Sequence, residues 1–547
     1  MNYFVKTFEK SIKECYDAPA LDDYKVSSVT YGELAAEIEV MHLVWRKAGM
    51  VAGDKISINA ASCSNWAKVF MAATSGGYVS VQIFNGFTAA DTQKMVNHSD
   101  SKILYTEKGT FAKMDFETMP ALLAIIDMKS GELLASRGGF DKIYAHRKEI
   151  FHEAHPAGLL SEDVCYADRA MDDLCCINYT SGSTGTPKGV MLTVRNISSN
   201  VDLIPRYFPY HRGETYLSIL PFAHIFGMLY DMATPLCLGM HLTILCMPPI
   251  PKFFKEALCE VQPTVIMIVP LVLNKMCEYT IGEFVHSKTG AAKLATSSDN
   301  QDFCKALRCI FMAATGGKCE LIVTGGAALP AELEDLLAIK LQIPLVTGYG
   351  MTECGPTISL GQLGKYKAKS TGEVVDCMEV RINSENPESV AGEVLVKGDN
   401  VFVGYYKNPE ADRQVFTDDG WFRTGDLGMK DKDGTLFLVG RCKSMLLSTN
   451  GHNVFPEEIE VLLNPMPYVA ESLIVQRENR FVAIIVPNSD ALANDNVNRD
   501  GLEEIMSHNI EKLNSEIPTY EFISEYELHF EPFSKTPKGS IKRFLYS

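Results

Sequence analysis

Short apolar runs alternate with longer amphipathic stretches through the N-terminal part of the chain. The runs that this pattern predicts as strands are Lys55 to Ala60, Tyr78 to Phe84, Lys102 to Tyr105, Leu122 to Asp127, Thr264 to Val269 and Glu320 to Thr324. Strands that alternate with helical stretches are typical of βαβ units, in which helices cover a sheet. The pattern therefore predicts a layered α/β architecture.

The pattern changes after Arg381. Short strands there are separated by Asp-Gly and other Gly-rich turns, as in GEVLVKG, TDDGWFRTGD and KDKDGTLFLVG, which predicts an antiparallel β subdomain over about 375–440. Beyond Arg441, the chain offers a helix at Pro456 to Leu463, a strand at Phe481 to Val486 and a helix around Leu502 to Asn514. These elements are enough for a small α+β domain.

Two polar segments follow neither pattern. Residues 287–302 (SKTGAAKLATSSDNQD) are rich in small and polar side chains, and residues 491–500 (ALANDNVNRD) are rich in Asn and Asp. Such residues favour turns, so we expect a loop or short exposed insertion at the first segment and a surface loop at the second.

One stretch, Leu217 to Ile250, is apolar enough that a membrane-spanning helix has to be considered. His224, Asp231, His241 and several prolines interrupt it, so that no unbroken run approaches the roughly 18 residues of a spanning helix. We expect buried core, and peripheral membrane contact stays open. The first 20 residues carry charges throughout and no apolar signal-peptide core, and the 15 cysteines include no CxxC pair, which indicates reduced thiols. A cytoplasmic location is the resulting expectation.

Composition narrows the class of protein but leaves its chemistry open. The 51 Lys and Arg against 68 Asp and Glu give a net charge of −17, which argues against a protein that wraps nucleic acid or coats an anionic membrane. Charged residues at 22% and hydrophobic residues at 46% are ordinary for a globular protein. The function therefore has to come from motifs.

The strongest motif is a glycine-rich loop at Tyr179 to Val190, YTSGSTGTPKGV, which follows the apolar run LCCIN. Its hydroxyl groups and exposed backbone N–H groups could cradle a polyphosphate. It is not a Walker A loop, because Pro187-Lys188-Gly189 replaces the Gly-Lys-Ser/Thr ending. The alternative is a simple cluster of turn residues.

This ordered string resembles the signature loop of the adenylate-forming superfamily, which includes acyl-CoA synthetases, luciferase and peptide-synthetase adenylation domains. Further segments resemble that family's motifs in the same order, and the resemblance covers residues 28–543. They are Leu220 to Gly227 (LPFAHIFG), Leu321 to Pro330 (LIVTGGAALP), Thr347 to Pro356 (TGYGMTECGP), Trp421 to Asp426 (WFRTGD) and Gly440 to Glu460 (GRCKSMLLSTNGHNVFPEEIE). The last segment and the GGKCE before Leu321 favour long-chain fatty acid–CoA ligases.

The resemblance implies an ATP site. The implied ATP-binding residues are Thr180, Ser181, Gly182, Ser183, Thr184, Gly185, Lys188, Gly325, Gly326, Ala327, Tyr349, Gly350, Thr352, Asp426 and Arg441. Among them, Tyr349 would stack on adenine, Asp426 would accept the ribose hydroxyls and Thr352 would contact phosphate. Glu353 would hold Mg²⁺. The aromatic face of a tyrosine suits stacking on adenine, and a carboxylate oxygen suits binding of a hard cation.

The resemblance also implies an acyl pocket and a moving domain. The implied pocket residues are His224, Phe226, Gly227, Pro270 and Gly348, with His224 also counted as catalytic, although a histidine on an apolar stretch is by itself more often a core residue. Lys443 would be the hinge pivot, and Gly451 would lie beside the CoA channel. The implied architecture is a large multi-subdomain α/β domain over 1–440, a hinge at 441–444 and a smaller, mobile α+β cap over 445–547.

Two positions depart from the family pattern. The C-terminal pattern PKTxxGKIxR matches Ser534 to Arg543, SKTPKGSIKR, with Ser540 in place of the lysine that bridges carboxylate and α-phosphate. Losing such a donor costs about 2.7 to 4 kcal/mol of transition-state stabilisation. Lys538 or Lys542 could compensate; both lie two residues from Ser540, and we favour Lys538. The second departure is the sequence 192–196, LTVRN, where relatives often have LTHxN, and its consequence is open.

The implied reaction is ATP-dependent ligation of a fatty acid to CoA through an acyl-adenylate, with Mg²⁺ and without a covalent enzyme intermediate. Two alternatives remain: an enzyme that loads the adenylated acid onto a carrier protein, and a nucleotide- or lipid-binding homologue whose adenylation is impaired by Ser540.

Overall fold

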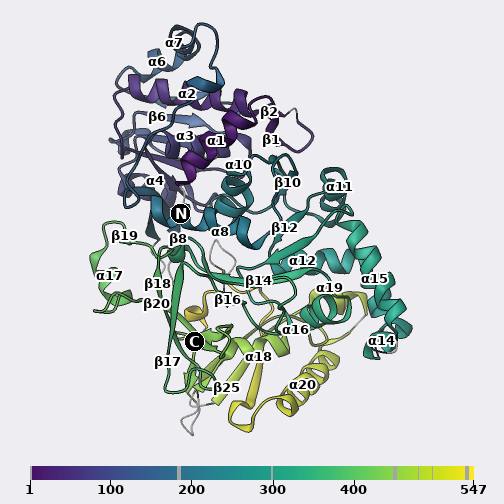
Figure 1. Cartoon of the computed structure of the whole chain (residues 1–547). Helices are drawn as coiled ribbons and strands as arrows, with labels where there is room; N and C mark the ends of the chain where they lie inside the picture. The colour runs from purple at the N-terminus through teal and green to yellow at the C-terminus, as the bar shows by residue number, and fades with distance from the viewer. Residues whose placement is uncertain are drawn as a thin grey trace. The chain divides into compact units, whose positions relative to one another are not determined.

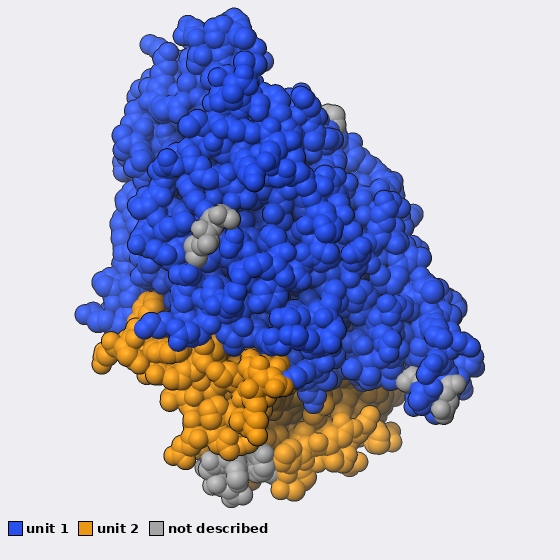
Figure 2. All heavy atoms as spheres, viewed as in Figure 1, with its two compact units in different colours: residues 1–182, 186–379, 397–414 blue, residues 183–185, 380–396, 415–547 orange. Residues whose placement is uncertain are grey.

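The computed structural model describes residues 3–26, 28–180, 187–296, 298, 300–447, 453–477, 480–495, 497–535 and 541–546. Contacts group the chain into two compact units, coloured blue and orange in Figure 2. Unit 1 comprises residues 1–182, 186–379 and 397–414, and unit 2 comprises 183–185, 380–396 and 415–547. Unit 2 thus includes most of the β-rich stretch as well as the C-terminal residues, and the hinge at 441–444 stays a prediction.

An eight-stranded sheet organises the first part of unit 1. In spatial order its strands are β19 (Gly404–Tyr405), β9 (Lys188–Thr193), β8 (Leu174–Thr180), β4 (Val79–Gln82), β3 (Lys55–Asn59), β5 (Ile103–Thr106), β6 (Ala124–Asp127) and β7 (Leu133–Ser136). The five central strands β8, β4, β3, β5 and β6 run parallel, and antiparallel strands complete both edges. Four of the apolar runs predicted as strands are central strands here, because each is buried along its length, as expected for a parallel sheet covered by helices.

Two further sheets complete unit 1. One contains β12 (Val265–Ile268), β13 (Leu321–Thr324), β14 (Leu345–Gly350), β15 (Thr357–Leu360) and β16 (Glu373–Val374); the other contains β10 (Thr215–Ser218), β11 (His241–Ile244), β1 (Pro19–Asp23) and β2 (Val29–Thr30). Strands β12, β13 and β14 are parallel. Their core includes Phe254, Leu273, Phe311 and Leu337, which come from the helices beside the sheet. The remaining two predicted strands are therefore confirmed.

Helices lie beside these sheets in the purple-to-teal part of Figure 1. The helices of unit 1 are α1 (Phe4–Glu14), α2 (Tyr31–Lys47), α3 (Ser64–Ser75), α4 (Ala89–Ser99), α5 (Lys108–Phe111), α6 (Phe140–Ala145), α7 (Arg147–Ala154), α8 (Val194–Tyr207), α9 (Ile225–Met228), α10 (Thr234–Cys237), α11 (Pro251–Val261), α12 (Pro270–Cys277), α13 (Glu283–His286), α14 (Lys288–Ala295), α15 (Gln301–Ala314) and α16 (Ala331–Glu334); α17 (Pro409–Val415) ends at the first residue of a unit 2 segment. A π-helical turn, Leu229–Ala233, joins α9 to α10.

Unit 2 holds the antiparallel sheet predicted after Arg381 and a small α+β part. The sheet contains β17 (Met378–Asn383), β18 (Gly392–Gly398), β20 (Phe422–Lys430) and β21 (Leu436–Arg441). The α+β part contains β22 (Leu446–Leu447), β23 (Asn453–Val454), β24 (Val469–Arg477), β25 (Arg480–Pro487), β26 (Ile523–Leu528), α18 (Pro456–Leu463), α19 (Ser489–Asn494) and α20 (Arg499–Glu516). Its apolar core joins α18 and α20 to the three longer strands. The predicted mixed α/β class is confirmed.

The two segments predicted as loops are corrected by the structure. Residues 287–302 contain α14 and the start of α15, and residues 491–500 contain the end of α19 and the start of α20. The polar residues that indicated turns are helix caps: Ser287 accepts a hydrogen bond from Gly290 N, and Asn498 accepts one from Gly501 N. Ser and Asn serve turns and N-caps through the same short acceptor side chain, so composition alone does not separate the two.

The apolar stretch 217–250 forms core as predicted through most of its length. Its strands and helices are buried as far as Leu245, while Met247 and Ile250 are about half exposed. Among the described residues, no helix combines the length and the apolarity needed to cross a bilayer. All fifteen cysteines are free of disulfide bonds.

Candidate functional site

The glycine-rich loop joins the two strands of a hairpin, β8 and β9. Thr180 and Lys188 are paired at its open end, where Thr180 Oγ1 donates to the carbonyl of Lys188 at 3.5 Å. Below this end, Ile177 and Tyr179 are buried in the sheet core. The hairpin therefore fixes both ends of the loop, while Ser181, Gly182, Ser183, Thr184 and Gly185 lie outside the described residues.

Lys188 and Glu353, two residues predicted for the site from distant motifs, both contact Tyr405. The ammonium nitrogen of Lys188 lies 4.8 Å from the centre of the Tyr405 ring, and the Tyr405 hydroxyl donates to Glu353 Oε1 at 3.0 Å. Strand β19 pairs with β9 so that Tyr405 lies opposite Val190. Burial is the main cause that raises the pKa of Tyr405, and the negative charge of Glu353 raises it further. The phenol therefore stays protonated and donates a hydrogen bond.

Glu353 sits in a short turn that backbone contacts hold. The turn is the 3₁₀ helix Thr352–Cys354, in which Thr352 is buried. The carbonyl of Glu353 accepts a hydrogen bond from Phe402 N at 2.8 Å, close to the strand that carries Tyr405. The turn thus presents the Glu353 carboxylate from a fixed backbone.

Magnesium, which the resemblance implies at Glu353, fits this arrangement. Proteins usually hold Mg²⁺ through one or two carboxylates together with substrate phosphates and water. Tyr405 bonds one of the two oxygens of Glu353, which leaves the other for a hard cation. No cluster of three or more His, Cys, Asp or Glu residues suited to a metal occurs in the described part of the chain, so the phosphates and water would supply the other ligands.

The carboxyl ends of three parallel strands bring together the predicted adenine and acyl segments. Register aligns Ile268 of β12 with Thr324 of β13, and Thr324 with Thr347 of β14. The segments that come next along the chain therefore share one edge of the sheet, which is where open α/β sheets bind ligands. They contain Pro270 at the start of α12, Gly325, Gly326 and Ala327 after β13, and Gly348, Tyr349 and Gly350 at the end of β14.

Glycine is required in this region by close packing and by backbone conformation. A Cβ on Gly325 would lie 3.2 Å from the carbonyl oxygen of Gly348, and one on Gly350 would lie 2.1 Å from that of Pro356. Gly326 has φ of +82° and nothing within 4 Å of its Cβ position. The Gly-Gly turn therefore leaves open space over its own backbone, as close approach of a flat group requires.

His224 belongs to a segment packed against the first sheet. Its ring stacks on Phe84, which follows β4, with centroids 4.7 Å apart, and Asn178 of β8 donates to the carbonyl of Ala223 at 3.1 Å. Gly227 is needed because a Cβ there would lie 2.4 Å from the carbonyl oxygen of Pro221. The fold thus places the His224 segment at the carboxyl ends of β4 and β8, and Phe226 packs edge-on against Tyr230.

A buried carboxylate, Asp231, holds the beginning of this segment. It lies in the π-helical turn and is fully buried. It accepts four hydrogen bonds, from Tyr216 OH at 2.7 Å, Ser218 Oγ at 2.8 Å, Ile219 N at 2.7 Å and Leu220 N at 2.7 Å. Burial raises the pKa of Asp231 to about 6, although these donors favour the ionised form. The sequence indicated only that Asp231 interrupts an apolar stretch.

The segments of His224 and Glu353 are linked by a buried polar network. Tyr230, from the helix that follows His224, donates to Asn200 Oδ1 at 2.7 Å and contacts Thr357 Oγ1. Thr357 lies opposite Gly350 in the pairing of β14 with β15. The network therefore ties the helix after His224 to the strand end that precedes Glu353.

The segment 192–196 keeps the two family-pattern residues that start α8, Thr193 and Asn196, and nothing in the structure explains Val194 in place of the family histidine. Thr193 caps α8 and forms a capping box with Asn196. The Asn196 amide also donates to the carbonyls of Asp399 and Val401 at 2.7 and 2.9 Å. Asn196 thus both starts the helix and holds the segment that leads to Tyr405.

In unit 2, the residues predicted for ribose lie opposite each other on neighbouring strands. Register pairs Asp426 of β20 with Arg441 of β21, and Arg441 Nε lies 3.1 Å from Asp426 Oδ1. Asp426 is buried while the Arg441 side chain is 63% exposed, so the guanidinium can reach a ligand as well as the carboxylate. Lys443 is exposed in the turn that follows, and Gly451 lies outside the described residues.

The C-terminal segment is anchored on both sides of residues 536–540, which include Lys538 and Ser540 and lie outside the described residues. Lys535 and Ile541 form an antiparallel bridge, and Lys542 N donates to the Ser534 carbonyl at 2.9 Å. Arg543 forms an ion pair with the buried Glu460, whose pKa burial raises to about 7. Lys542 is thus held next to this anchor.

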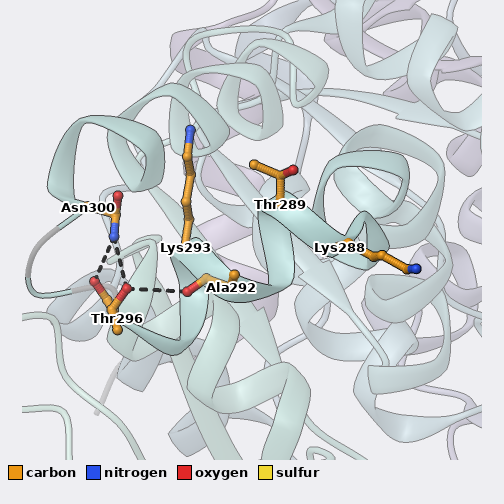
Figure 3. Close-up of a pocket in the computed structure, with 6 residues that line it drawn as sticks. All are labelled: Lys288, Thr289, Ala292, Lys293, Thr296 and Asn300. Carbon is orange, nitrogen blue, oxygen red and sulfur yellow. Dashed lines mark hydrogen bonds between the residues drawn. The ribbon is translucent and has the colours of Figure 1, made fainter.

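A surface hollow of about 490 Å³ lies along α14 (Figure 3). It is lined by Lys288, Thr289, Ala292, Lys293, Thr296 and Asn300. The Asn300 amide donates to Thr296 O and Oγ1 at 3.1 and 3.0 Å, and Thr296 Oγ1 donates to the Ala292 carbonyl at 3.2 Å. None of the candidate residues lines this hollow, so it is not part of the site.

Comparisons with known proteins identify the family of the chain. The model for AMP-binding enzymes matches residues 8–406, and the model for the AMP-binding enzyme C-terminal domain matches 443–546. The long-chain-fatty-acid–CoA ligase FadD15 of Mycobacterium bovis is 29% identical over 487 residues, covering 84% of this chain and 77% of the relative. The 4-coumarate–CoA ligase 1 of Arabidopsis thaliana is 25% identical over 559 residues, covering 98% and 90%.

Solved structures show the same fold. ATP-bound MatB from Rhodopseudomonas palustris has a TM-score of 0.76 at 21% identity, covering 100% of this chain and 98% of that one. The anthranilate CoA ligase AuaEII in complex with anthranoyl-AMP has a TM-score of 0.79 at 19% identity, covering 100% and 96%. Since the first family model alone spans well over half of the sequence, the chain belongs to the AMP-binding enzyme family, within the adenylate-forming superfamily.

Proposed function

We propose that the protein is an AMP-forming ligase that joins a long-chain fatty acid to CoA. The observation that carries this proposal is the 29% identity to a long-chain-fatty-acid–CoA ligase over 84% of the chain. It is supported by contacts that join separate motifs, above all Lys188 and Glu353 through Tyr405.

ATP would bind along the shared edge of β12, β13 and β14. Adenine would lie against Tyr349 and the turn at Gly325, Gly326 and Ala327, where Gly326 leaves open space. The phosphates would lie between the glycine-rich loop, Lys188 and Thr352, and Mg²⁺ on Glu353 would offset their negative charge when bound. Asp426 and Arg441 would take the ribose hydroxyls.

The reaction would proceed in two displacements. A carboxylate oxygen of the acid attacks the α-phosphorus of ATP, and the bond to the β-phosphate oxygen breaks, so that pyrophosphate leaves. The CoA sulfur then attacks the acyl carbon, the bond to the AMP oxygen breaks, and the thiol proton passes to solvent. The chain would contribute mainly alignment of reactants and stabilisation of phosphate charge, with Lys443 as the pivot between the steps and Gly451 beside the CoA channel.

The acid would bind between the His224 segment and the edge of the second sheet. Phe226, Gly227, Pro270 and Gly348 would line this space, and their apolar or small side chains would suit a hydrophobic chain. The relatives include ligases of 4-coumarate as well as of fatty acids, so an aromatic acid is the second candidate substrate.

Ser540 favours a second candidate function. If neither Lys538 nor Lys542 replaces the family lysine, the protein would bind nucleotide and acid without efficient adenylation. A carrier protein in place of CoA is a further alternative for the acceptor.

A single assay separates these functions. The purified chain would be incubated with ATP, Mg²⁺ and a panel of fatty, aromatic and amino acids, with CoA, with a phosphopantetheinylated carrier protein or with neither, and AMP and pyrophosphate would be measured. A fatty acid–CoA ligase gives AMP that depends on both a fatty acid and CoA. Strongest turnover with aromatic acids would overturn the substrate assignment. Absence of turnover with every acid would overturn the proposal that the protein is an enzyme.

A further inference from the structure

Tyr405 is the point at which two charged groups of the proposed ATP site meet. Its ring lies under the Lys188 ammonium at 4.8 Å, and its hydroxyl donates to Glu353 Oε1 at 3.0 Å. Lys188 and Glu353 come from hairpin β8–β9 and from the turn after β14, and Tyr405 comes from the edge strand β19. It is buried, with 6% of its surface exposed.

We propose that Tyr405 is a positioning residue that sets the Glu353 carboxylate for a divalent cation and the Lys188 ammonium for phosphate. This role rests on the proposed function, because Lys188 and Glu353 belong to the proposed ATP site.

The physical reason is that a neutral group separates two opposite charges. Lys188 and Glu353 are both described, and no ion pair joins them; each contacts the phenol instead. A direct ion pair would neutralise both groups and would have to break before ATP and its cation could bind. The aromatic face attracts an ammonium without neutralising it, and the hydroxyl fixes one carboxylate oxygen without taking up the other.

Two features hold Tyr405 in this position. Its backbone N donates to Asp412 Oδ1 at 2.7 Å, and its ring packs edge-on against Phe402 with centroids 4.9 Å apart. The ring is thereby fixed before any ligand arrives. Partners that orient a ligand of a metal typically change metal affinity by about 10- to 100-fold when they are lost.

The two halves of the proposal can be tested by separate substitutions. Tyr405→Phe keeps the ring under Lys188 and removes the hydroxyl from Glu353, whereas Tyr405→Leu removes both contacts. Tyr406→Phe is the matched control, because Tyr406 is the next residue and its hydroxyl bonds Asp100 at 3.3 Å instead of a site residue.

Binding of Mn²⁺ in the presence of a non-hydrolysable ATP analogue, followed by electron paramagnetic resonance, is the first readout. Binding of the analogue in EDTA, followed by calorimetry, is the second. We expect Tyr405→Phe to weaken Mn²⁺ binding by about tenfold and to leave metal-free analogue binding within twofold. Tyr405→Leu should weaken both, and Tyr406→Phe should leave both unchanged.

The proposal is overturned if Tyr405→Phe binds Mn²⁺ as the unsubstituted chain does, or if Tyr406→Phe shows the same loss. A lower thermal midpoint with unchanged Mn²⁺ binding would mean that Tyr405 is only structural. These measurements need no turnover, so they remain decisive if the ligase assay finds no acid substrate. If the unsubstituted chain binds neither the analogue nor Mn²⁺, the proposed function fails and this inference with it.

Discussion

Replacing Asp231 with asparagine tests how the segment of His224 is held. Asp231 is buried with four hydrogen-bond donors, yet burial raises its pKa from the ordinary 3.8 to about 6. A shift of this size corresponds to about 3 kcal/mol, at about 1.4 kcal/mol for each pH unit. The folded chain therefore binds the proton more tightly than the unfolded chain does.

The sign of the pH effect follows from this difference. Between pH 4 and pH 6 the unfolded chain loses the proton before the folded chain does, so the contribution of Asp231 to stability falls as pH rises. Integrated from pH 5 to pH 7.5, this loss is about 1 to 2 kcal/mol. The asparagine variant lacks the titrating group. We therefore expect the stability of Asp231→Asn relative to the unsubstituted chain to increase by that amount over the interval.

Urea unfolding followed by tryptophan fluorescence provides the measurement. Trp45 and Trp66 are buried in unit 1 and report on the unit that contains Asp231, and a Trp421→Phe background removes the signal from unit 2. Asp302→Asn is the matched control, because the Asp302 side chain is fully exposed. A stability difference that stays constant with pH would refute the reasoning, because the four donors would then cancel the effect of burial. A difference that decreases as pH rises would refute it too, and would show that the donors outweigh burial.

Three further substitutions test other parts of the structure. Ser540→Lys should leave pyrophosphate exchange nearly unchanged if a neighbouring lysine already compensates; an increase of several hundredfold would exclude compensation. Gly227→Ala should lower unfolding free energy by about 1 to 3 kcal/mol, because its Cβ would lie 2.4 Å from the carbonyl oxygen of Pro221. Gly109→Ala, which meets no atom within 4 Å, is its control, and equal effects in urea unfolding would contradict the argument. Asn196→Ala should cost about 1 to 3 kcal/mol by the same measurement, because it loses a helix cap and two hydrogen bonds to backbone carbonyls, and an unchanged midpoint would contradict this.

The strands could be predicted because the information for them is local. Four apolar runs became central strands of one sheet and two became neighbouring strands of another. A strand buried on both faces needs a continuous apolar run, and such a run is visible without knowledge of its partners. Helix α18 is also predicted from its local sequence, and its bounds coincide with those of the predicted helix.

Local information failed where one residue type serves two structures. The composition around Ser287 and Asn498 predicts loops, whereas these residues are the N-caps of α14 and α20. The segment KTGAAKLA contains several good helix formers, which was the signal that could have corrected the first interpretation.

The α/β class, the order of the motifs and the resemblance that carries the proposed ATP site all follow from the amino-acid sequence. The position of Tyr405 between Lys188 and Glu353 follows only from the folded chain, because pairing of β19 with β9 brings residue 405 next to a hairpin more than two hundred positions earlier. Likewise, Asp231 holds the His224 segment only through hydrogen bonds that close when the π-helical turn packs on β10. Contacts of this kind depend on which strands become neighbours. The spacing of residues along the chain does not reveal which strands pair, because strand pairing depends on packing of the whole core.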